Sequence, residues 1–144
     1  MYSIYLTNLG LRDFIEKDNQ DLINQGKLNR VMQHRVYKDQ YGIDLRDTYD
    51  VEQSIYEYIY CILMEYKNQA TIINFHYHTV EYKGVVWYQD EVIDRVLNAI
   101  KQWLLFRNED YPFYLGIPIE NELKDSLHLF IEIMECMWWY VWIR

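Results

Sequence analysis

Two histidines, His76 and His78, lie two positions apart in the stretch TIINFHYHTVEY, and Glu81 follows them. The alternating β-forming residues of this stretch predict a strand, in which side chains two positions apart point to the same face. Two imidazoles on one face with a carboxylate nearby can bind a divalent metal ion. A metal-dependent enzyme built on His76 and His78 is therefore one hypothesis. Strict alternation places Glu81 on the opposite face, so we favour exposed strand histidines, with no metal and no cofactor.

The His-x-His pair with a later glutamate resembles the cupin motif, and this resemblance covers only His76, His78 and Glu81. It would imply many strands and a third histidine from a later strand. The chain offers only His34 and His128 besides, in segments with helical spacing. No GxSxG, HExxH, P-loop or GxGxxG motif occurs, and five glycines leave little material for a phosphate-binding loop. We therefore expect a protein that is not an enzyme.

A second kind of chemistry comes from carboxylates interleaved with tyrosines. Tyrosine brings a large contact area with few rotatable bonds, and surrounding carboxylates steer a basic partner toward it. We predict two partner-binding clusters on this basis, with a solvated acidic surface as the alternative. The first contains Asp44, Asp47, Tyr49, Asp50, Glu52, Tyr56 and Glu57, with Tyr58 beside them; the second contains Glu109, Asp110, Tyr111, Tyr114, Glu120 and Glu122, with Asp125 beside them.

The net charge is −8, from 22 acidic and 14 basic residues. This sign argues against direct binding of nucleic acid, which needs a positive surface, and suits a basic protein partner. The predicted function is a small acidic inhibitor from a phage or mobile element, of the anti-CRISPR or antirestriction type. It would block a host nuclease by occupying the basic surface that binds nucleic acid. The alternatives are an immunity protein that neutralises a nuclease toxin, and a structural subunit of an oligomer.

The segment IYLTNLG, Ile4 to Gly10, is similar to the opening of ArdA-type antirestriction proteins, which are acidic mimics of DNA. The similarity covers seven residues of 144, and the rest of the chain does not follow that family. It implies the same class of function as the acidic clusters, and it transfers no functional residues.

The size and composition predict one compact domain over residues 1–144. The chain is 51% hydrophobic and 17% aromatic, which is too apolar for a disordered protein. Cys61 and Cys136 lack CxxC spacing, and we expect two reduced thiols in a cytoplasmic protein. The first ten residues lack the features of a signal peptide, so we expect the mature chain to begin here. The apolar run from Leu127 to Ile143 contains His128, Glu132 and Glu135, so we expect no membrane span.

The elements that must position these residues follow from hydrophobic spacing and from glycine, proline and capping residues. The class is α+β and dominated by helices, with a short antiparallel sheet packed against four to five helices. The sheet would combine a strand over Tyr2–Leu9 with a hairpin at about 71–89, whose turn is Lys83-Gly84. The expected helices are two short ones over 11–26, the second capped by Asp18 or Asn19, then Lys27–Lys38, 51–69 after candidate caps Asp47 and Asp50, 90–108, and a last helix from Ile119 or Glu120 after a loop over 109–118.

Three helices carry predictions about their faces. Leu28, Val31, Met32 and Val36 would form the apolar stripe of the third helix, opposite a basic strip of Lys27, Arg30, His34 and Lys38 that is either a solvated face or a contact for phosphate or an acidic partner. Val51, Ile55, Ile59, Ile62, Leu63 and Tyr66 would form the buried face of the next helix. Val92, Ile93, Val96, Leu97, Ile100, Leu104 and Leu105 would form the core face of the helix over 90–108.

The chain ends on its most apolar stretch, MECMWWYVWIR. A helix that is apolar on all sides must be buried, so we expect a buried terminal helix, with a terminal strand as the alternative. The same segment could mediate a homodimer.

Overall fold

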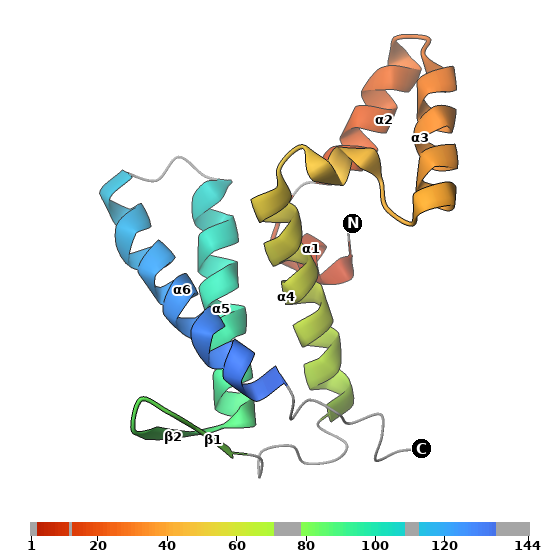
Figure 1. The fold of residues 1–144 in the computed structure, drawn as a ribbon. Helices are drawn as coiled ribbons and strands as arrows, with labels where there is room; N and C mark the ends of the chain where they lie inside the picture. Colours follow the sequence, from red (N-terminus) through yellow and green to blue (C-terminus); the bar gives the residue numbers. More distant parts are fainter. Residues whose placement is uncertain (1–2, 12, 71–78, 109–112, 135–144) are drawn as a thin grey trace, which may run out of the picture. The chain divides into compact units, whose positions relative to one another are not determined.

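The computed structural model describes residues 3–11, 13–70, 79–108 and 113–134. Figure 1 shows the elements in chain order. They are α1 (Ile4–Asn8), α2 (Phe14–Asn24), α3 (Leu28–Tyr41), the 3-10 helix η1 (Leu45–Thr48), α4 (Val51–Ala70), β1 (Thr79–Tyr82), β2 (Val85–Tyr88), α5 (Gln89–Arg107), the 3-10 helix η4 (Phe113–Leu115) and α6 (Gly116–Ile133). The predicted α+β class dominated by helices is confirmed.

The chain divides into two compact units, Met1–Ile59 and Tyr60–Arg144, and each is described by itself. The expectation of one domain over residues 1–144 stays a prediction.

The predicted N-terminal strand is wrong, because Ile4–Asn8 forms α1. The reason lies in how the helix ends. Gly10 adopts a φ of 79°, its N–H donates to the Thr7 carbonyl, and the Leu11 N–H donates to the Leu6 carbonyl. This pair of bonds is the Schellman motif, in which apolar residues at the two ends of the longer bond pack together. Leu6 and Leu11 are both buried, so glycine here terminates a helix rather than a strand.

One helix, α2, replaces the two short helices expected before Gly26, and it lies beside α3 (Figure 1). The carboxylate of Asp13 accepts a hydrogen bond from the Glu16 N–H, which makes Asp13 the N-cap. The predicted cap at Asp18 or Asn19 is therefore wrong, since both residues lie inside the helix.

The predicted apolar faces of α3 and α4 are wrong in part. Val31 is the one member of the α3 stripe that is buried, while Leu28, Met32 and Val36 are exposed. On α4, Leu63 is buried as expected. The neighbouring side chains of Tyr60 and Cys61 are buried too, whereas Val51, Ile55 and Ile62 are exposed. Periodicity located both helices correctly but did not identify which side of each is covered.

The hairpin pairs β1 with β2 in antiparallel register, with Thr79 opposite Tyr88 and Tyr82 opposite Val85. Lys83 and Gly84 both have positive φ, 51° and 78°, as a two-residue type I′ turn requires. The turn was predicted correctly. Within the described ranges the sheet has two strands, and residues 4–8 do not join it because they are helical. The expected strand residues 71–78 lie outside the described residues.

The core of the second unit lies between α5 and α6, which run side by side with the hairpin near one end (Figure 1). The predicted core residues of α5 are buried, except that Leu105 is half-buried. They face Leu123, Leu129 and Ile133 of α6, which are also buried. Burying side chains of this size contributes roughly 1.5–3 kcal/mol each.

The loop predicted over 109–118 is too long, because η4 begins at Phe113 and α6 at Gly116. Pro118 fits the first turn of α6, where no backbone donor is needed. Cys136 and the apolar segment 135–144 lie outside the described residues. None of the helices in the described ranges combines the length and the hydropathy of a membrane-spanning segment.

Candidate functional site: an acidic, tyrosine-bearing surface and a pocket

The first predicted cluster lies on η1 and the first half of α4. We call Asp47, Tyr49, Asp50, Glu52, Tyr56, Glu57 and Tyr58 the acid–tyrosine surface. Tyr49 is 65% exposed and Tyr58 is 53% exposed, with Val51 and Ile55 exposed between them. Glu52 is exposed, while Asp47, Asp50, Tyr56 and Glu57 are half-buried. The surface therefore combines apolar rings and methyl groups with carboxylates.

Asp44 does not belong to this surface, because its side chain is buried against Arg46. The carboxylate accepts hydrogen bonds from Arg46 Nε at 2.9 Å, Nη2 at 2.8 Å and the backbone N–H at 2.9 Å. These hydrogen bonds hold the pKa of Asp44 below its ordinary value. Nη1 of Arg46 reaches α2, where it donates to Asp18 Oδ2 at 2.9 Å and Asn19 Oδ1 at 2.6 Å. Arg46 thus joins η1 to α2, and Asp44, which is bound to Arg46, has little capacity left for a partner.

Two carboxylates of the acid–tyrosine surface are shaped by α4 itself. Asp50 Oδ1 accepts from the Gln53 N–H at 3.2 Å, which confirms Asp50 as a capping residue. Glu57 accepts a hydrogen bond from Gln53 Nε2 at 2.9 Å. Burial raises the pKa of Glu57 despite this bond, so removal from water is the larger effect. The charge of Glu57 is therefore less well solvated than that of a fully exposed glutamate.

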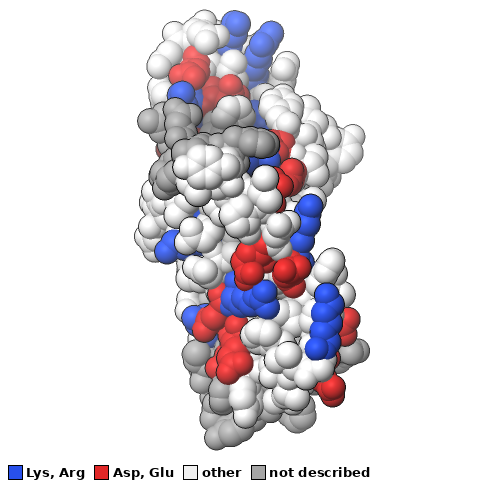
Figure 2. Space-filling model, turned by 90° about the vertical axis from the view of Figure 1, so that its left-hand side faces the viewer, with Lys and Arg blue, Asp and Glu red and all other residues white. Residues whose placement is uncertain are grey.

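The second predicted cluster is only partly described. Glu109, Asp110 and Tyr111 lie outside the described residues. Tyr114 is 70% exposed and Glu120 is exposed. Glu122 is paired with Arg95 through bonds of 2.7 and 3.1 Å. Figure 2, which views the α6 side, shows acidic and basic side chains intermixed over the lower part of that face. Around its described members, this cluster does not form a surface of one sign.

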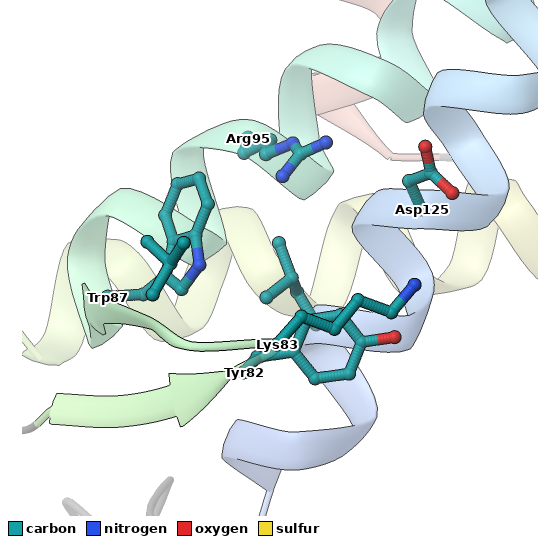
Figure 3. Close-up of a pocket in the computed structure, with 7 residues that line it drawn as sticks. Tyr82, Lys83, Trp87, Arg95 and Asp125 are labelled. Carbon is teal, nitrogen blue, oxygen red and sulfur yellow. The ribbon is translucent and has the colours of Figure 1, made fainter.

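A pocket that the sequence did not predict lies between the hairpin, α5 and α6, with a volume of about 200 Å³. Figure 3 draws its lining residues and labels five of them, Tyr82, Lys83, Trp87, Arg95 and Asp125; Val85 and Leu129 complete the lining. The Arg95 guanidinium lies 5.3 Å from the Trp87 ring centroid, and the Lys83 ammonium lies 5.3 Å from that of Tyr82. The type I′ turn and the strand alternation were the available signals for Lys83 and Trp87. The contact between Trp87 and Arg95 could not be predicted from the sequence, because it depends on how the hairpin packs on α5.

The metal-site hypothesis gains no support from the described residues. Among them, no group of three His, Cys, Asp or Glu side chains could hold a metal ion. His76 and His78 lie outside the described residues, and Glu81 is exposed on β1. On α3 the basic strip is present, with Lys27, Arg30 and Lys38 exposed and His34 half-buried.

No protein-family model, curated protein or solved structure matches the chain.

Proposed function

We propose that this protein is a small acidic inhibitor that binds a basic, nucleic-acid-binding protein through the acid–tyrosine surface. Its target would be a host nuclease, as for an anti-CRISPR or antirestriction protein of a phage or mobile element. The observation that carries the proposal is the exposure of Tyr49 and Tyr58 beside the carboxylates of η1 and α4. Aromatic anchors surrounded by charge are typical of protein interfaces.

The local charge supports a basic partner. Between residues 44 and 58 there are five acidic residues and one basic residue, Arg46. Arg46 is 4% exposed and its guanidinium is bound to Asp44, so the exposed charge of this stretch is mainly acidic. A negative field of this kind speeds association with a positive surface and weakens as salt rises. A nucleic-acid-binding groove offers such a surface.

The apolar side chains favour a protein target over free cations. Val51 and Ile55 are exposed in the same part of α4 as Tyr58. Burying them in an interface would contribute to affinity, whereas simple ion binding would leave them in water.

A capture experiment with the full chain tests this proposal. The immobilised protein is exposed to a host lysate at low salt, and bound proteins are eluted with high salt. We expect a basic nuclease or other nucleic-acid-binding protein, whose binding to its nucleic acid is then inhibited by the free chain. If no such protein is recovered, or if the recovered protein still binds nucleic acid normally, the proposal fails. Capture of a toxin nuclease would instead favour the immunity-protein alternative.

Single substitutions test whether the acid–tyrosine surface is the interface. Glu52→Lys and Tyr49→Ala should each weaken binding by about tenfold or more, mainly by slower association for the first and by faster dissociation for the second. The matched control is Glu16→Lys, since Glu16 is also an exposed glutamate in the first turn of a helix of the same unit. If Glu52→Lys and Glu16→Lys reduced the binding affinity equally, the loss would reflect the net charge of the protein, and the acid–tyrosine surface would not be the interface.

A further inference from the structure

The pocket of the second unit carries polar donors with no partner of their own in the described part of the chain. Arg95 donates from Nε and Nη2 to Glu122, which leaves its Nη1 group without a hydrogen bond there. The Lys83 ammonium lies over the Tyr82 ring, and the Trp87 ring lies under the Arg95 guanidinium. Neither the Lys83 ammonium nor the Trp87 indole N–H makes a hydrogen bond to a described residue. Three donors, two of them on cationic side chains, therefore line one pocket.

The same pocket carries an anionic group. Asp125 lines it from α6, and its carboxylate accepts no hydrogen bond from the described residues. Its charge is close enough to help raise the pKa of Arg95, after the larger effect of the Glu122 bonds. Figure 3 shows Arg95 and Asp125 on neighbouring helices at the upper side of the pocket, with the Tyr82-Lys83 end of the hairpin below.

The remaining lining is apolar or aromatic. Val85 and the ring of Trp87 come from β2, and Leu129 comes from α6. Such a wall favours a hydrocarbon or aromatic group that leaves water. The volume of about 200 Å³ is below the roughly 300–1,000 Å³ typical of drug-sized ligands, so the ligand is small.

We propose that this pocket binds a free α-amino acid with an apolar side chain. Lys83, Arg95 Nη1 and the Trp87 N–H would receive its carboxylate, Asp125 would receive its ammonium, and the apolar wall would receive its side chain. A ligand with one charge would gain from Lys83 or from Asp125 and be repelled by the other. A zwitterion uses both, because its charges are opposite and adjacent. This site lies in a different unit from the acid–tyrosine surface, and it does not depend on the proposed function.

In the direct test, the full chain is titrated with L-leucine, L-leucinamide and N-acetyl-L-leucine. Binding is measured by calorimetry and by the shift of the NMR signal of the Trp87 indole N–H. L-Leucinamide lacks the carboxylate and N-acetyl-L-leucine lacks the ammonium. We expect saturable binding of L-leucine and at least about tenfold weaker binding of both analogues, since each analogue loses one ion pair and places its remaining charge near a like charge of the pocket. Equal affinities for the three probes, or no saturation by L-leucine at about 10 mM, would overturn the proposal.

Two charge-removing variants should separate the two halves of the zwitterion. Lys83→Asn suits the positive φ of this turn position. It should weaken L-leucine binding but should not weaken, and should if anything strengthen, the binding of cationic L-leucinamide, because a like charge is removed. Asp125→Asn should weaken L-leucine binding but should not weaken, and should if anything strengthen, the binding of anionic N-acetyl-L-leucine, because a like charge is removed. Lys101→Gln on α5 and Glu120→Gln on α6 are controls, because both residues are exposed and neither lines the pocket. Losses in the controls as large as in the pocket variants would show a nonspecific charge effect and refute the site.

Discussion

The two units are stabilised in different ways. In the described part of the unit Met1–Ile59, four apolar side chains are buried, those of Leu6, Leu11, Leu22 and Val31, and the polar pair Asp44 and Arg46 is buried with them. In the described part of the unit Tyr60–Arg144, fourteen apolar side chains are buried, mostly along α5 and α6. The first unit therefore depends on directional hydrogen bonds, and the second on apolar burial.

The smaller core of the first unit leaves apolar side chains exposed. Apolar residues that a larger core would cover, such as Val51, Ile55 and Tyr49, are exposed in the first unit. They adjoin carboxylates, which is why this unit presents the better candidate for a protein interface. The second unit buries more apolar side chains, mainly along α5 and α6, although Tyr114, Ile117 and Ile131 are exposed, and it presents a small pocket.

All five tryptophans lie after residue 59, so tryptophan fluorescence reports on the second unit and far-UV circular dichroism on both. The largest expected effect is that of Arg46→Met. It leaves the buried Asp44 carboxylate without its cation, which typically costs about 3–5 kcal/mol. We expect a urea transition at lower concentration in circular dichroism, with the fluorescence transition little changed. Arg35→Met, at an exposed position of α3, is the control. Coincident shifts of both signals would instead indicate that the chain unfolds as one cooperative domain.

Leu104→Ala should produce the reverse pattern. Leu104 of α5 is fully buried, and its truncation removes apolar contacts and leaves a cavity at a cost of roughly 2–5 kcal/mol. The fluorescence transition should move to lower urea concentration. Ile131→Ala, at an exposed position of α6, should change stability by less than about 0.5 kcal/mol. A Leu104→Ala protein as stable as the wild type would contradict the assignment of the core to α5.

Acid should destabilise the first unit through Asp44. Hydrogen bonds from Arg46 lower the pKa of Asp44 in the folded state below its ordinary value of 3.8. The resulting stabilisation is present above pH 3.8 and is lost as the pH falls through the lower folded-state pKa. Circular dichroism between pH 6 and pH 2 should show this loss, and Asp44→Asn should be less stable at pH 6 with a flatter pH dependence. An unchanged slope in Asp44→Asn would assign the acid sensitivity to other carboxylates.

The smallest effect is expected for the exposed ion pair of the second unit. Glu122→Gln removes the carboxylate that binds Arg95, but both side chains are partly in water. Such pairs contribute about 0–1 kcal/mol, so the fluorescence transition should move only slightly. A loss as large as that of Arg46→Met would remove the contrast between the two units.

Local sequence pattern was sufficient for most elements. Helical spacing predicted α3, α4 and α5 to within a few residues, and Lys83-Gly84 predicted the turn of the hairpin. It failed at α1, where alternation suggested a strand, because five residues carry too little periodic signal to distinguish the two. The signal that could have corrected it was Gly10 followed by the apolar Leu11, which is typical of a helix end.

The candidate sites were less accessible to sequence reasoning. Asp44 looked equivalent to Asp47 and Asp50, and only the folded chain distinguishes it as the buried partner of Arg46. Arg46 is 28 residues from Asp18, and no spacing rule relates them. The pocket likewise combines the hairpin with Arg95 and Asp125, which come from two different helices.

The sequence by itself determined the acidic balance, the helix-dominated class and the positions of most helices, because charge, hydrophobic spacing and capping act over a few neighbouring residues. Only the tertiary structure decided which face of each helix is covered, which carboxylate is neutralised and where a pocket forms. These outcomes depend on contacts between residues that are distant in the chain. Each such contact forms only if its free energy offsets the conformational entropy that the two segments lose on ordering. That balance depends on both segments, so the residues near either one in the sequence do not determine it.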